Sequence, residues 1–337
     1  SVAKTNTQPF TLDCVYPEVT ISVPYLLFSP DGDESKDNVP VEIVSSKEKR
    51  WTGRIENKNG ALVKEYIWEG NAQSFVWDGT DESGNKVADG MYKIVVSSQD
   101  DAGNKVITKL ENLTVDTRDA KVYLTLAEDA ISPNGDGFKD NQDFSIRTTL
   151  SEGIESWIFN IKSSDGSVVY SWNQDDSANL PAKITWNGCN KDGIPNEGSF
   201  TGELFIKYAK GNSVTAATSS FICTATPPQL VVQTAPKNFS PDHDGVDADL
   251  YIALSATSAV PFKNWSFSVY DPQNGKVFWS RSGSSTITER MIWDGRGNNG
   301  ELIQTASDFP YSFKVTDALG MTSEVKGMIS VDVLVIR

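Results

Sequence analysis

The sequence predicts an all-β protein built from three tandem β-sandwich domains in an elongated arrangement, and three observations carry this prediction. Turn-forming Gly, Asn, Asp and Ser recur at short intervals along the 337 residues, which is typical of short strands joined by tight turns. No window shows a sustained apolar period of 3.6, so no long amphipathic helix is expected. Finally, two motifs each occur three times at a domain-sized spacing.

The first motif is rich in Asp and Gly and follows a Ser-Pro pair. Its copies are "FSPDGDESKD" from Phe28, "ISPNGDGFKD" from Ile131 and "FSPDHDGVDAD" from Phe239; they are called acidic loops 1, 2 and 3 below. The second motif is Trp-x-Gly with a further Gly five residues after the first. Its copies are "WDGTDESG" from Trp77, "WNGCNKDG" from Trp186 and "WDGRGNNG" from Trp293.

The tryptophans follow the same repeat. All nine fall into three sets of three: Trp51, Trp157 and Trp265; Trp68, Trp172 and Trp279; Trp77, Trp186 and Trp293. Between the first two sets each copy carries a turn, and Asn-Gly and Asp-Gly are strong hairpin signals because both residues of a type I′ turn need positive φ. Units of this size can bury their own cores. The predicted division is a leader at 1–15 and modules 1, 2 and 3 at 16–118, 119–228 and 229–337.

Module 1 shows seven short runs of alternating or β-branched residues separated by turn signals. These predicted strands are 19–27, 39–45, 51–56, 61–68, 74–77, 91–99 and 105–115. Seven such strands are the pattern of an immunoglobulin-like (Ig-like) sandwich. In "MYKIVVSS", Tyr92, Ile94 and Val96 share one face, which should meet the opposite sheet. The tryptophans are expected to fill the core or to cap its ends.

Charge and hydropathy exclude several function classes. The net charge is −15 and the acidic residues are spread over all three modules, so no basic patch is available for nucleic acid or anionic lipid. No stretch reaches the roughly 20 apolar residues that span a bilayer, so no membrane insertion of this chain is expected. Three cysteines are too few for a disulfide framework. Two interpretations stay open: a Cys189–Cys223 disulfide, or Cys223 as a small buried hydrophobe.

The acidic loops are candidate calcium sites, because calcium takes 6–8 oxygen ligands that Asp and Asn can supply from a short Gly-containing loop. The candidate ligands are Asp31, Asp33 and Asp37; Asn134, Asp136 and Asp140; and Asp242 and Asp244. The third loop is altered, since His243 replaces a glycine and Ala248 replaces the last Asp. The alternative is a network of Asx-turns, in which the same side chains accept backbone N–H bonds while the loop crosses between sheets. The turn network is favoured, no cofactor is required, and calcium remains possible.

An enzyme is not expected. The single histidine, His243, removes most general-base and zinc constellations. A catalytic carboxylate pair normally occurs once, whereas these acids recur with the module.

The two motifs and the "DGMYKIVVSSQDDAGN" ending of module 1 resemble bacterial Ig-like modules. They are similar to the Ig/fibronectin-III-like domain of the flagellar hook-capping protein and to related cell-envelope repeat proteins. The resemblance implies a non-catalytic envelope or surface protein that acts as a scaffold, spacer or adhesion stalk. It also implies a periplasmic, outer-membrane-associated or extracellular location in a bacterium, with a protein or cell-envelope component as partner.

Other functions stay open at this point. One alternative is an array that binds carbohydrate or a host ligand, which would need aromatic side chains on an open surface. Another is a flagellar or appendage assembly factor. The ending "MISVDVLVIR" resembles the lead-in to an OmpA-like peptidoglycan-binding domain. In that case a C-terminal domain is missing here, and it would link the protein to peptidoglycan.

Overall fold

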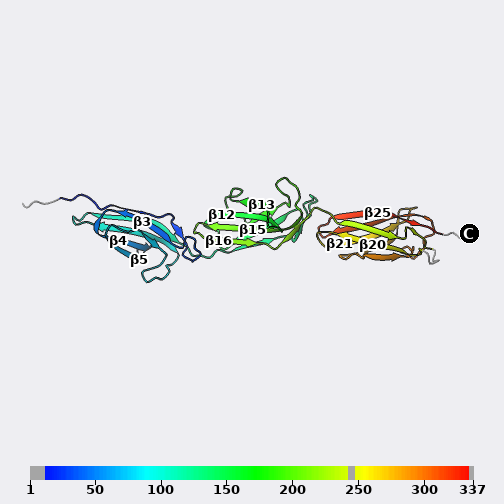
Figure 1. Ribbon diagram of the computed structural model, residues 1–337, viewed down its shortest axis with the longest axis horizontal. Coiled ribbons are helices and arrows are strands. Elements are labelled where there is room, and N and C mark those ends of the chain that lie inside the picture. The colour runs from blue at the N-terminus through cyan, green and yellow to red at the C-terminus, as the bar shows by residue number, and fades with distance from the viewer. Residues whose placement is uncertain (1–11, 242–246, 334–337) are drawn as a thin grey trace, which may run out of the picture.

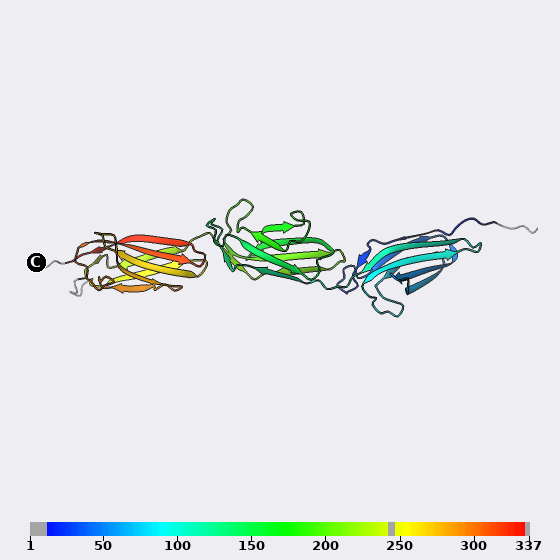
Figure 2. The ribbon, with the colours of Figure 1, turned by 180° about the vertical axis from the view of Figure 1, so that it is seen from behind.

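The computed structural model describes residues 12–241 and 247–333. Three β-sandwich modules follow one another in a row, and both views show the same extended shape (Figures 1 and 2). Every regular element of the described residues is a strand, so the all-β prediction is confirmed. In these residues there is no helix with the length and apolar character needed to cross a membrane.

Module 1 is a sandwich of a three-stranded and a five-stranded sheet, in the orders β1-β3-β6 and β2-β8-β7-β4-β5. All neighbouring strands are antiparallel except β2 and β8, which form a short parallel pair. The strands are β1 Val19–Ser22, β2 Leu27–Phe28, β3 Val39–Ser45, β4 Glu48–Asn57, β5 Leu62–Gly70, β6 Phe75–Trp77, β7 Gly90–Gln99 and β8 Lys105–Val115.

One predicted strand of module 1 is wrong. The run 19–27 was expected to be continuous, but it divides into β1, which pairs with β3, and β2, which pairs with β8 in the other sheet. Pro24 lies in the gap. It has no N–H for a ladder and fixes φ, so the chain leaves the first sheet at this point.

Module 2 repeats the arrangement, with sheets β9-β11-β14 and β10-β17-β15-β12-β13, and β16 also pairs with β15. Its β16 and β17 together take the place of the single strand β8. The strands are β9 Val122–Leu126, β10 Ala130–Ile131, β11 Gln142–Thr148, β12 Ile154–Ser163, β13 Val168–Asn173, β14 Lys183–Trp186, β15 Gly198–Tyr208, β16 Ser213–Ala217 and β17 Phe221–Cys223.

Module 3 has the sheets β18-β20-β23 and β19-β25-β24-β21-β22, again with one short parallel pair, β19 with β25. The strands are β18 Gln229–Ala235, β19 Asn238–Phe239, β20 Leu250–Thr257, β21 Phe262–Tyr270, β22 Val277–Gly283, β23 Arg290–Trp293, β24 Ser307–Asp317 and β25 Thr322–Val331.

Each module has a separate hydrophobic core between its two sheets. Seven of the nine tryptophans are buried in these cores. The other two, Trp68 and Trp172, are half-buried and pack against the cores of modules 1 and 2. The repeated tryptophans are therefore packing residues, as the repeat predicts.

Candidate functional site

Acidic loop 1 carries the chain from one sheet of module 1 to the other, because β2 ends at Phe28 and β3 begins at Val39. The carboxylate of Asp37 holds the loop closed. Its Oδ1 accepts the N–H of Gly32 at 2.6 Å, and its Oδ2 accepts the N–H of Glu34 at 2.8 Å. Both oxygens of this side chain thus serve the backbone of the loop.

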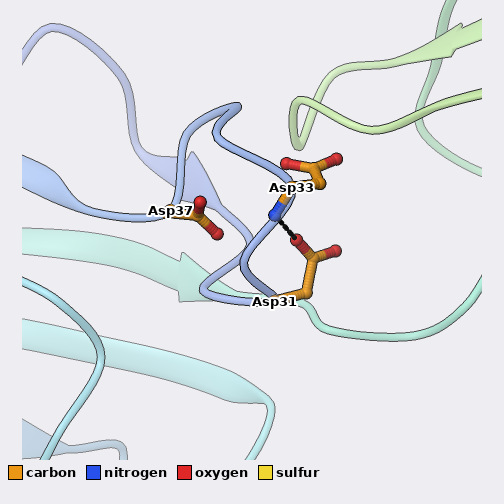
Figure 3. A group of neighbouring side chains, drawn as sticks. All are labelled: Asp31, Asp33 and Asp37. Carbon is orange, nitrogen blue, oxygen red and sulfur yellow. Dashed lines mark hydrogen bonds between the residues drawn. The ribbon is translucent and has the colours of Figure 1, made fainter.

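Asp31 and Asp33 form successive Asx-turns in the same loop. The N–H of Asp33 donates to Asp31 Oδ1 at 3.2 Å, and the N–H of Ser35 donates to Asp33 Oδ1 at 2.8 Å. Figure 3 shows the three aspartates gathered around the turn, and one oxygen of each lies within 4.8 Å of the others. These three aspartates are the candidate calcium ligands of acidic loop 1.

Acidic loop 2 repeats the pattern of bonds. Asp140 accepts the N–H groups of Gly135 and Gly137, both at 2.8 Å. Asn134 accepts the N–H of Asp136 at 3.0 Å, and Asp136 accepts that of Phe138 at 2.7 Å. The candidate ligands Asn134, Asp136 and Asp140 thus each accept a backbone N–H of this loop.

In acidic loop 3 the candidates Asp242 and Asp244 lie outside the described residues, as does His243. The edge of the loop is described. There the carbonyl of Asp247 accepts the N–H of Ser240 at 2.9 Å, at a φ of 53° for Asp247.

The observed bonds are those of the Asx-turn network, and the calcium sites stay a prediction. The pKa of Asp31 is lowered: burial raises it, but hydrogen bonds from Asn212, Ser29 and the N–H of Asp33 outweigh burial. A lowered pKa keeps this carboxylate ionised, which suits both hydrogen-bond acceptance and a cation.

The two repeated motifs pack against each other in every module. Pro30 of acidic loop 1 lies on Gly79 of the Trp-x-Gly motif, so close that a Cβ on Gly79 would stand 2.7 Å from Pro30 Cγ. Gly79 also has a φ of 71°, in the region that favours glycine. The same packing joins Pro133 to Gly188 and Pro241 to Gly295.

The tryptophan of this motif closes the turn that follows it. Its indole N–H donates to the carbonyl three residues later at 2.8–3.0 Å, and the pairs are Trp77 with Thr80, Trp186 with Cys189 and Trp293 with Arg296. A buried indole N–H needs such a partner. The acidic loop and the Trp-x-Gly turn therefore form one structural unit at the C-terminal end of each module.

Acidic loop 1 also contacts module 2, which the sequence did not predict. Ser35 Oγ donates to the carbonyl of Gly211 at 2.9 Å, and Lys36 Nζ donates to that of Ala209 at 2.6 Å. Asn212 Nδ2 donates to Asp33 Oδ2 at 2.9 Å and also to Asp31. The light-green loop beside Asp33 in Figure 3 belongs to module 2.

Acidic loop 2 lies against the corresponding turn of module 3. Ser132 Oγ lies 3.3 Å from the Sδ of Met321, and Phe138 lies next to Gly320. The only sequence signal for these contacts was the glycine that each turn carries, Gly211 in module 2 and Gly320 in module 3. A repeated turn does not reveal which module it will contact.

The cysteines are free in this structure: Cys14 is exposed, Cys189 is half-buried and Cys223 is buried. Burial is the main cause that raises the pKa of Cys223 to about 12, and nearby Glu197 adds to it. Cys223 is thus a small buried hydrophobe, the second of the two interpretations of the sequence.

Comparison with known proteins supports the module type. Residues 31–102 match the family profile of the FlgD Ig-like domain. No curated protein sequence matches the chain.

Similar solved structures include a tetra-tandem repeat in the extending region of a large adhesion protein, at 17% identity and a TM-score of 0.32, over 95% of this chain and 76% of that one. A 1.5-MDa bacterial ice-binding adhesin gives 13% and 0.34, over 96% and 100% of the two chains. The complex of Dpr2 Ig1-Ig2 with DIP-Theta Ig1-Ig3 gives 10% and 0.40, over 95% and 100%. Likenesses this low carry no argument about function. The chain is a tandem array of Ig-like modules, and its first module matches the FlgD Ig-like domain over residues 31–102.

Proposed function

We propose that this protein is a non-catalytic spacer or adhesion stalk of a bacterial surface or envelope. The observation that carries the proposal is the pair of contacts that hold three separately folded modules in one extended row (Figure 1). A protein that must place a binding end away from its anchor needs length and a preferred shape. Repeated modules with short, bonded junctions supply both.

The repeat itself supports the absence of a catalytic role. The best-formed polar cluster recurs in modules 1 and 2, and its side chains are used to hold loop backbone. The match to the FlgD Ig-like domain supports a bacterial envelope or surface location. A protein or cell-envelope component is the proposed partner, and a link to peptidoglycan through a further domain remains part of this proposal.

The tryptophans give little support to a carbohydrate-binding array. Such an array needs rings on an open surface, whereas none of the nine tryptophans is exposed. An appendage assembly factor rests on resemblance alone.

Small-angle X-ray scattering of the full chain tests the stalk proposal. A single compact globule of this length would have a radius of gyration of about 20 Å. We expect a clearly larger value and an elongated distance distribution. Antibody labelling of intact cells that produce the protein tests the location. A compact particle, or a protein recovered in the cytoplasmic fraction of the cells, would contradict the proposal.

A further inference from the structure

The junction between modules 1 and 2 is built around a buried lysine. Lys210 lies at the tip of the turn that joins β15 to β16, and only 3% of its side chain is exposed. Its Nζ lies 3.6 Å from Asp116 Oδ1 at the end of module 1 and donates to the carbonyl of Arg118. The ammonium group of module 2 is therefore inserted into the anionic end of module 1.

The rest of this junction is polar as well. The neighbours of Lys210 in sequence bond to acidic loop 1: Ala209 to Lys36, Gly211 to Ser35 and Asn212 to Asp33. Gly211 lies so close to acidic loop 1 that a Cβ there would stand 2.5 Å from the carbonyl oxygen of Ser35. The backbones of the two modules are thus in close contact at Gly211 and Ser35, and Lys210 and Asp116 lie beside this contact.

The junction between modules 2 and 3 has the opposite chemistry. Leu319 and Met321 of the β24–β25 turn are buried with Val260, and they pack against Ala130 and Ile222 of module 2. Within residues 12–241 and 247–333, no ion pair joins modules 2 and 3. This junction is held by apolar contact together with the one bond from Ser132 Oγ to Met321 Sδ.

The turns that make the two junctions are structurally equivalent. In each, the glycine N–H donates to the carbonyl three residues earlier, and the pairs are Gly103 with Asp100, Gly211 with Tyr208 and Gly320 with Asp317. Lys210 of module 2 therefore occupies the position of Leu319 in module 3. In module 1 the same position is Ala102, which is exposed.

The residues that face these turns also differ between the two junctions, acidic at the first and neutral at the second. The N–H of Asp116 donates to the carbonyl of Phe28, just as the N–H of Thr224 donates to that of Ile131, so Asp116 and Thr224 are equivalent. Asp31 is equivalent to Asn134 by the same criterion, since each donates its N–H to the serine two residues before it. Asp116, which faces Lys210, and Asp31, whose pKa Lys210 helps to lower, thus have neutral counterparts where the turn is apolar.

We propose that the charge and the apolarity of these turns act as a pairing code that fixes which module docks on which. The Lys210 turn of module 2 fits the Asp116 end of module 1, and Leu319 and Met321 of module 3 fit the apolar patch of Ala130 and Ile222 on module 2. A wrong pairing either takes the buried ammonium group away from Asp116, which keeps only Arg118, or buries an ammonium group among Ala130 and Ile222. Both are costly, and similar repeats that fold side by side are otherwise prone to mispairing.

Two reciprocal exchanges in the full chain test the code. Lys210→Leu places the residue of the second junction in the first, and Leu319→Lys does the reverse. Spin labels are attached at exposed Lys109, Ser145 and Ser255, each changed to Cys. Pulsed electron–electron double resonance then measures the 109–145 distance across the first junction and the 145–255 distance across the second. Cys14 and Cys189 are first changed to Ser, while buried Cys223 stays.

For Lys210→Leu we expect the 109–145 distance distribution to broaden while the 145–255 distribution stays narrow. The ratio of docked to undocked conformers at the first junction should fall by about tenfold or more, because Asp116 loses its buried partner and keeps only the exposed Arg118. Leu319→Lys should broaden only the 145–255 distribution.

The matched control is Lys207→Met on β15 of the same module, whose ion pair with Glu155 is exposed and joins two residues of module 2. It should leave both distributions unchanged. Lys36→Met tests the first junction from the side of module 1, in case Lys210→Leu does not fold. The proposal is overturned if Lys210→Leu and Lys36→Met both behave like the control, or if either exchange broadens both distributions alike.

Discussion

Pro30 lies against the backbone of Gly79, so that the Ser-Pro of one repeated motif rests on the Trp-x-Gly of the other. The two motifs are 49 positions apart in module 1. Their contact explains why the proline and the glycine occur together in all three modules. The glycine leaves room for the proline ring, and the ring covers the turn that the tryptophan closes.

This packing predicts a specific stability loss. Gly79→Ala should lower the free energy of unfolding of module 1 by about 2–4 kcal/mol, because a Cβ both strains a positive φ and meets the Pro30 ring. Gly84→Ala is the matched control: its φ is 81°, but nothing lies within 4 Å of the added Cβ. It should cost only about 1 kcal/mol for the backbone strain. Equal losses in urea unfolding of the two variants would show that the proline contact does not matter.

The acidic loops predict a result with calcium. Since both oxygens of Asp37 already hold loop N–H groups, we expect millimolar calcium to leave the melting temperature of the protein unchanged. Asp37→Ala should lower the stability of module 1 by about 1 kcal/mol with or without the ion, as two N–H groups lose their acceptor. The calcium site would instead be established by a calcium-dependent rise in melting temperature that is absent in Asp31→Asn, together with a heat of calcium binding in titration calorimetry.

Asp165 in the β12–β13 turn predicts a pH effect. Hydrogen bonds from the side chains of Ser163 and Ser167 lower its pKa from 3.8 to about 2. A lowered pKa in the folded state means that this stabilisation is complete above pH 3.8 and is lost as the pH falls toward 2. Carboxyl titration by NMR should show the low pKa in the native protein and a value nearer 3.8 in Ser163→Ala. Ser177→Ala, outside this turn, should leave it unchanged.

The cysteines predict an order of reactivity. A neutral-pH thiol reagent should modify exposed Cys14 first and Cys189 next, whereas Cys223 should react only after unfolding, since a pKa of about 12 leaves almost no thiolate. Mass spectrometry of the digested protein identifies the modified sites. A native Cys189–Cys223 disulfide in that digest would contradict the free thiols.

Much of the fold could be predicted because its signals are local. The hairpin turn at Gly60, the alternation of Tyr92, Ile94 and Val96, and the Asx pattern of acidic loop 1 each depend on residues close in sequence. The break at Pro24 was missed because the apolar pattern continues through it. The junctions could not be predicted, since Ser35 meets Gly211 only after two complete modules have folded.

The parallel pairing of β2 with β8 has a mechanical consequence. Tension along the chain reaches each module through its first strands and leaves through its last, and parallel strands loaded at opposite ends are pulled past each other lengthwise. Their backbone hydrogen bonds then bear the load together instead of one after another. We expect single-molecule pulling at the two ends to give three separate unfolding events, each at a higher force than pulling the β4–β5 hairpin apart from its open end.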